Sequence, residues 1–143
     1  MMTTEKIYEG FLGDWELDIA ASDFGQGEAP AAGGYKISDG KHGILFVIEW
    51  TDAEGKSHSY NFTGIPDGEP HPFDGQDLVD SMVVEVPTAQ ELTSRGFYKG
   101  RELMVAARFL MEEGAVMEIT QTVLLPDGSK PSNVARYRRK LHS

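Results

Sequence analysis

The chain has 143 residues, a net charge of −10 and no cysteine. This length predicts one domain, residues 1–143, and the missing cysteines exclude disulfides, thiolate metal ligands and cysteine nucleophiles. The acidic charge disfavours nucleic acid as a partner. Because no signal peptide and no membrane-spanning apolar run can be recognised, we expect a cytoplasmic protein without membrane insertion.

The first predicted element is a strand over residues 11–19, in which apolar residues alternate with acidic ones. Residues 20–33 are rich in alanine and glycine, which predicts a loop with at most one short helical turn. Strands are expected next over residues 35–38, 44–51 and 57–63. The strand 44–51 is almost entirely apolar, so we expect both of its faces to be covered.

Residues 64–77 contain three prolines and three glycines, a composition that excludes a central strand or a helix. A loop of this length is either functional or covers one end of the fold. Five more strands are predicted over residues 81–86, 91–98, 102–111, 115–125 and 133–141. Tight turns between short strands predict an all-β fold, an antiparallel up-and-down β-barrel of about 8–10 strands.

The opening strand carries a resemblance to a known group of proteins. The pattern Phe11-x-Gly13-x-Trp15-x-Leu17 at the start of an all-β chain resembles the calycin superfamily, in particular a bacterial lipocalin-like family of largely unknown function. The resemblance implies that Gly13 and Trp15 close one end of the barrel and that an arginine of the last strand packs on the indole. Such a contact contributes about 0.5–2 kcal/mol.

Arg136 and Arg138 are the predicted partners of that tryptophan, and because they share one face of the last strand the sequence does not choose between them. The resemblance to fatty-acid-binding proteins is incomplete. Residues 20–33 are too rich in glycine and proline for the two helices of a helix-turn-helix lid, so fatty-acid binding does not follow from the resemblance.

The alternation of the middle strands predicts which side chains face the barrel interior. The candidate ligand-binding residues on this basis are Phe46, Ile48, Trp50, His58, Tyr60, Phe62, Met82, Val84 and Met117. Arg108 is the tenth candidate. The better alternation of its strand turns Arg108 toward solvent, whereas the opposite register places it inside, where it could meet a ligand carboxylate.

The leading hypothesis is therefore a barrel that binds a small apolar or amphipathic ligand. One alternative is an enzyme of isomerase or hydrolase type that uses His58, Tyr60 or Arg108, and another is an interaction protein, such as a homodimer, with a filled barrel. A non-enzymatic role is favoured because no nucleophile or phosphate-binding motif is present. No metal site and no cofactor are predicted, since the four histidines have no ligand spacing.

Overall fold

In a computed structural model of the chain, the structure describes residues 7–24, 29–72 and 79–140. These residues form one antiparallel sheet with the strand order β4-β3-β2-β1-β10-β9-β8-β7-β6-β5. The prediction of an up-and-down barrel is confirmed. The strands are β1 (Gly13–Asp23), β2 (Ala32–Asp39), β3 (Ile44–Thr51), β4 (Ser57–Gly64), β5 (His71–Pro72), β6 (Ser81–Thr88), β7 (Glu91–Tyr98), β8 (Arg101–Met111), β9 (Val116–Val123) and β10 (Ser132–Arg139).

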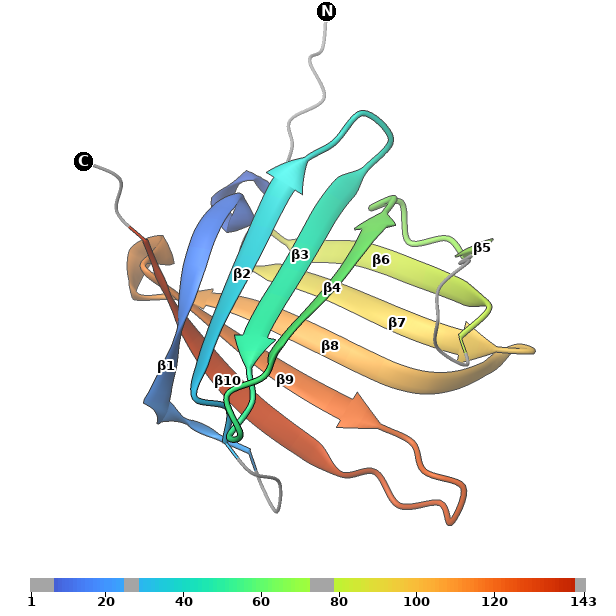
Figure 1. The fold of residues 1–143 in the computed structure, drawn as a ribbon. Helices are drawn as coiled ribbons and strands as arrows, with labels where there is room; N and C mark the ends of the chain where they lie inside the picture. The colour runs from blue at the N-terminus through green and yellow to red at the C-terminus, as the bar shows by residue number, and fades with distance from the viewer. Residues whose placement is uncertain (1–6, 25–28, 73–78, 141–143) are drawn as a thin grey trace, which may run out of the picture.

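The barrel is continuous on one side and has an unpaired seam, between β4 and β5–β6, on the other. Strand β1 pairs with β10 and so joins the two ends of the chain, while β1–β4 lie across β6–β10 (Figure 1). On the other side, β4 and β5 are the two ends of the sheet. There the backbone N–H of Gly68 donates to the carbonyl of Val84 at 2.9 Å. A Cβ at Gly64 would overlap Cγ2 of Val84, so the absence of a side chain allows this close approach.

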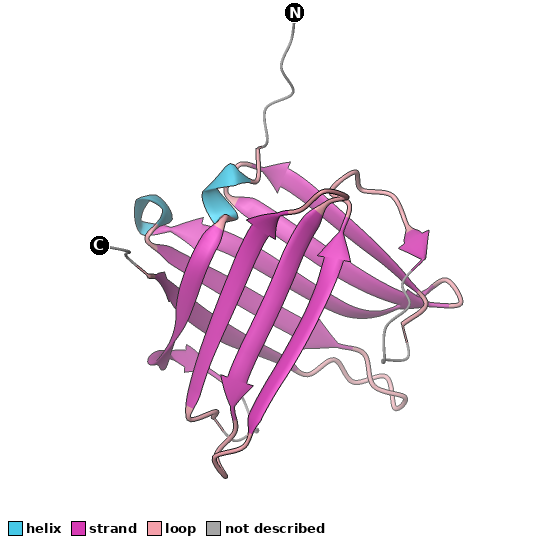
Figure 2. Ribbon diagram, turned by 45° about the horizontal axis from the view of Figure 1, so that its top comes forward, coloured by secondary structure: helices cyan, strands magenta, loops and turns pink. Residues whose placement is uncertain are grey.

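Three local features differ from the sequence prediction. The two-residue strand β5 lies in the loop expected over residues 64–77, and the last part of that loop lies outside the described residues. Strand β1 continues to Asp23, where the alternation of apolar residues had already ended. The helical structure of the described residues consists of two 3-10 turns, η1 (Glu9–Phe11) and η2 (Glu112–Gly114), near one end of the barrel (Figure 2).

Trp15 is buried beside η1 at that end of the barrel, and the cation that packs on it is Arg139. The indole is 1% exposed, and its Nε1 donates to the carbonyl of Phe11 at 3.0 Å. The guanidinium carbon of Arg139 lies 4.2 Å from the centroid of the indole. Arg139 also donates to the carbonyls of Leu12 at 2.7 Å, Gly114 at 3.1 Å and Gly10.

The prediction of Arg136 or Arg138 was therefore wrong, and strand register explains why. Trp15 is directly opposite Arg139 in the β1–β10 ladder, so these two side chains share the inner face. Arg136 and Arg138 are on the outer face, where they bind Glu118 and Asp18, each at 2.9 Å. No helix among the described residues has the length and apolarity needed to cross a membrane.

Candidate functional site

The candidate site is a cavity of about 590 Å³ inside the barrel, a volume within the range of small-molecule sites. Seven of the ten predicted ligand-binding residues line it: Ile48, Trp50, His58, Tyr60, Phe62, Met82 and Arg108. The other three, Phe46, Val84 and Met117, are fully buried in the hydrophobic core and do not line the cavity. The barrel is thus filled in one part and hollow in another.

Arg108 is the charged group buried deepest in this cavity. The residue is 2% exposed, and its guanidinium carbon lies 4.7 Å from the centroid of the Phe46 ring. The Tyr35 hydroxyl accepts from Nε at 3.1 Å and from Nη2 at 2.8 Å, and the Ser94 hydroxyl accepts from Nη2 at 3.2 Å. Nη1 donates to the carbonyls of Leu92 at 3.4 Å and Ala106 at 3.3 Å.

The inward position of Arg108 contradicts the better alternation of its strand. Arg108 is paired with Leu92 on β7 and with Ile119 on β9, and both of these residues face the interior. Phe109, which the alternation placed inside, is 37% exposed. The structure therefore selects the second of the two registers that the sequence left open, and it agrees with the choice of Arg108 as a candidate ligand-binding residue. The sequence could not decide because the outer face of β8 is also apolar, so apolar residues alone do not distinguish its two faces.

No carboxylate of a described residue forms an ion pair with Arg108. Its hydrogen-bond partners are neutral hydroxyls and carbonyls, so the buried positive charge has no counter-charge within the part of the chain that the structure describes. A buried charge without an opposite charge is costly, even when hydrogen bonds satisfy its donors. The site therefore favours an anion in the cavity.

Tyr137 is a second polar group beside the arginine. Its ring meets that of Tyr35 edge to face, with centroids 5.5 Å apart, and its side chain lines the cavity. The Tyr137 hydroxyl makes no side-chain hydrogen bond to another described residue. Burial, and next the nearby Tyr35, raise the pKa of Tyr137 far above its ordinary value, which keeps a hydroxyl donor available in the cavity.

Other cavity residues were not among the sequence candidates. They share the inner face of their strands with the predicted residues and include Leu17, Tyr35, Ser94, Met104, Ala106, Asn133, Ala135 and Tyr137. Ile119 and Gln121 also line the cavity, as the alternation of their strand with Met117 predicts. The alternation of side chains along paired strands could have identified the unpredicted residues. Trp15 is inside and lies opposite Tyr35 of β2, so Tyr35 is inside as well. Leu17, the next inward residue of β1, lies opposite Tyr137 of β10, which places Tyr137 inside.

His58 lies at the opening of the cavity and has a fixed orientation. Its ring stacks on that of Trp50, with centroids 5.2 Å apart, and its Nε2 lies 2.8 Å from a carboxylate oxygen of Asp52. The hydrogen bond from His58 is the main reason why the pKa of Asp52 is lowered. His58 is 42% exposed at its side chain, so this pair is a solvated one at the rim of the cavity.

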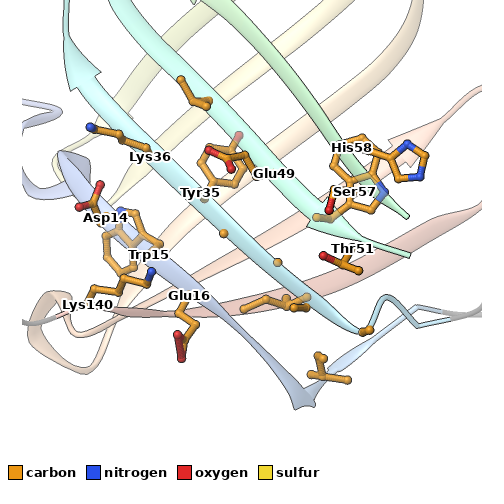
Figure 3. Close-up of a pocket in the computed structure, with 18 residues that line it drawn as sticks. Asp14, Trp15, Glu16, Tyr35, Lys36, Glu49, Thr51, Ser57, His58 and Lys140 are labelled. Carbon is orange, nitrogen blue, oxygen red and sulfur yellow. The ribbon is translucent and has the colours of Figure 1, made fainter. Parts of the chain in front are cut away.

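A second hollow of about 700 Å³ lies over the outer face of β1–β3 (Figure 3). Gly33 and Gly34 leave β2 without side chains at this point, and Glu16 and Glu49 stand on either side of it. Because its charged side chains do not converge on a common point, this hollow is the weaker candidate. No group of three or more potential metal ligands occurs among the described residues.

Comparison with known proteins supports the fold but does not identify a family or a ligand. No family model matches the chain, and no curated protein sequence matches it. Among solved structures, a mutant of the fluorescent protein UnaG is similar, with a TM-score of 0.59 and 20% identity over 92% of this chain and 96% of that one. A Schistosoma mansoni fatty acid binding protein, in complex with arachidonic acid, has a TM-score of 0.60 and 19% identity over 94% and 98%.

A zebrafish ileal bile-acid-binding protein, complexed with cholic acid, has a TM-score of 0.53 and 10% identity over 92% of this chain and 99% of that chain. The chain has the same kind of fold as these three structures, an antiparallel up-and-down β-barrel. At these identities the similarity concerns the fold alone.

Proposed function

We propose that the protein binds a small amphipathic organic acid inside the barrel, with the ligand carboxylate on Arg108 and its apolar body along the cavity. The observation that carries this proposal is the buried guanidinium of Arg108, which has no carboxylate partner among the described residues. A carboxylate accepts paired hydrogen bonds from a guanidinium and supplies the missing charge.

The remaining cavity wall supports an apolar ligand body. Ile48, Phe62 and Met82 line the cavity from β3, β4 and β6, and Tyr60 adds an aromatic surface. Pockets for small amphipathic molecules combine such walls with a few polar groups that fix orientation. Two proteins of similar fold are described with arachidonic acid and cholic acid, both of which join a carboxylate to a large apolar body.

The arginine can change partners without unfolding its surroundings. Two of its acceptors are the hydroxyls of Tyr35 and Ser94, which can rotate and donate to an incoming carboxylate. The Tyr137 hydroxyl is an additional donor on the same side of the cavity. We therefore expect the ligand carboxylate to receive hydrogen bonds from one cation and several neutral hydroxyls.

The test compares oleic acid with oleyl alcohol, which has the same chain but no carboxylate. Isothermal titration on delipidated protein should show that the acid binds about 10- to 150-fold more tightly, because a hydrogen bond to a charged group is worth about 1.5–3 kcal/mol. In Arg108→Met the difference between the two ligands should disappear. Arg101→Met is the control, because Arg101 is an exposed residue of the same strand.

Equal affinities of the wild-type protein for the acid and the alcohol would refute the role of Arg108. Failure of both to bind would refute the proposed function for this ligand size. Far-ultraviolet circular dichroism of Arg108→Met would show whether the variant is folded, and retained binding of oleyl alcohol would show that its cavity is intact.

A further inference from the structure

The amides of Gln121 and Asn133 form a second polar position in the cavity. Gln121 is on β9 and Asn133 on β10, where they are directly opposite each other in the ladder. Both side chains line the cavity, and neither makes a side-chain hydrogen bond to another described residue. Directly opposite residues have Cβ atoms about 4.5–5.5 Å apart, so one ligand group can reach both amides.

The strand register places this pair one step along the barrel wall from Arg108. Arg108 is opposite Ile119, and Ala106, the previous inward residue of the same strand, is opposite Gln121. Two residues along a strand correspond to about 6.6–6.8 Å. The amides are thus displaced from the proposed carboxylate position toward the middle of a bound chain.

The neighbours of the two amides leave room for a substituent on the ligand. Ala106 and Ala135 line the cavity next to them and have small side chains. Across the cavity, Tyr60 and Phe62 present aromatic surfaces from β4. The wall of β9 and β10 is therefore polar and recessed, whereas the opposite wall is aromatic. An unsubstituted hydrocarbon chain has no polar group that could bind to the amides of the first wall.

We propose that Gln121 and Asn133 are specificity-determining residues that select acids with a hydroxyl or keto oxygen along the chain over unsubstituted acids. This inference rests on the proposed function. Each amide offers a carbonyl acceptor and an NH2 donor, and a ligand hydroxyl can satisfy one of each. An unsubstituted chain would remove both amides from water without replacing their hydrogen bonds, which weakens its binding.

The experiment compares oleic acid with 7-hydroxyoleic acid, which has the same chain and one additional hydroxyl at a distance from the carboxyl group similar to the about 6.6–6.8 Å displacement of the amides. The wild-type protein should bind 7-hydroxyoleic acid about tenfold more tightly, as expected when unpaired polar groups are satisfied. In the double variant Gln121→Leu/Asn133→Leu this ratio should fall to about one or below, and the affinity for oleic acid itself should increase. Thr122→Leu on the outer face of β9 is the control and should keep the wild-type ratio.

The outcomes separate the two proposals. If both acids bind in an Arg108-dependent manner but with a ratio that the double variant leaves unchanged, the role of the amides is refuted and the proposed function stands. A wild-type preference for oleic acid would also refute it. If neither acid binds, the proposed function itself fails. Because Gln121 is exposed and Asn133 half-buried, the leucines do not replace core residues, and retained oleic acid binding confirms an intact cavity.

Discussion

Removal of the Arg139 side chain is expected to destabilise the barrel where the first strand meets the last. In Arg139→Met the indole of Trp15 loses its cation at 4.2 Å, and three carbonyls of Gly10, Leu12 and Gly114 lose their donor. Because the guanidinium is partly exposed, each hydrogen bond contributes only about 1 kcal/mol net, and the cation–π contact contributes about 0.5–2 kcal/mol. The expected loss in the free energy of unfolding is therefore about 3.5–5 kcal/mol.

The loss is large compared with the about 5–15 kcal/mol that stabilises a typical domain. Urea unfolding followed by circular dichroism gives the midpoint and the slope, and an unchanged slope would show that the loss lies in stability. Arg139→Lys should cost less, because an ammonium keeps one of the carbonyl bonds and the charge near the indole.

Arg138→Met is the matched control, one residue away on the same strand. Arg138 binds Asp18 on the outer face, and its side chain is 62% exposed. Exposed ion pairs contribute little to stability, so we expect an unfolding midpoint equal to that of the wild-type protein. If Arg138→Met and Arg139→Met lower the midpoint equally, the assignment of barrel closure to Arg139 is refuted.

Two further predictions concern the contact between Gly64 and Val84, which joins β4 to β6, and the phenol of Tyr137 in the cavity. Gly64→Ala should lower the free energy of unfolding by about 1–3 kcal/mol through overpacking, because its Cβ would overlap the Val84 side chain. Adding Val84→Ala to this variant should recover part of the loss. If thermal unfolding shows that Gly64→Ala is as stable as the wild-type protein, the contact is refuted. Because the folded-state pKa of Tyr137 is raised above the unfolded value, its contribution to stability is complete below about pH 10 and is lost as the pH rises further. Tyr137→Phe should therefore reduce the decline in stability above that pH, and denaturation curves of equal pH dependence for both proteins would contradict this.

Much of the fold could be predicted because it depends on local features of the chain. The strands 44–51 and 91–98 begin and end where the sequence predicts. Turns that contain glycine flank the first of them and follow the second, whereas Pro87 lies inside β6 and does not end it at residue 86. The element η1 was not predicted, because its three residues have no pattern of their own. Its position depends on contacts with Trp15 and Arg139, which become visible only when the barrel is closed.

The candidate site could be predicted only on the strands with a clear polar face. On β4, serine and asparagine alternate with His58, Tyr60 and Phe62, and all three of these residues line the cavity as expected. On β8 both faces carry apolar residues, so the orientation of Arg108 was undetermined without the pairing of β8 with β7 and β9. The arginine on Trp15 required the β1–β10 register in the same way.

Arg139 and Arg108 both lie on the inner face of the barrel, but their hydrogen-bond partners differ. This difference indicates a structural role for Arg139 and supports the proposed ligand-binding role of Arg108. Apart from the Trp15 indole, Arg139 contacts backbone carbonyls at η1 and η2, which cannot rotate away from it. Arg108 instead has two hydroxyl partners, on Tyr35 and Ser94, which can reorient. A ligand anion can therefore enter the hydrogen-bond network of Arg108 without disturbing the contacts that hold the first and last strands together. Substitutions at the cavity should consequently change affinity independently of the stability provided by Arg139, since sites without shared partners behave additively.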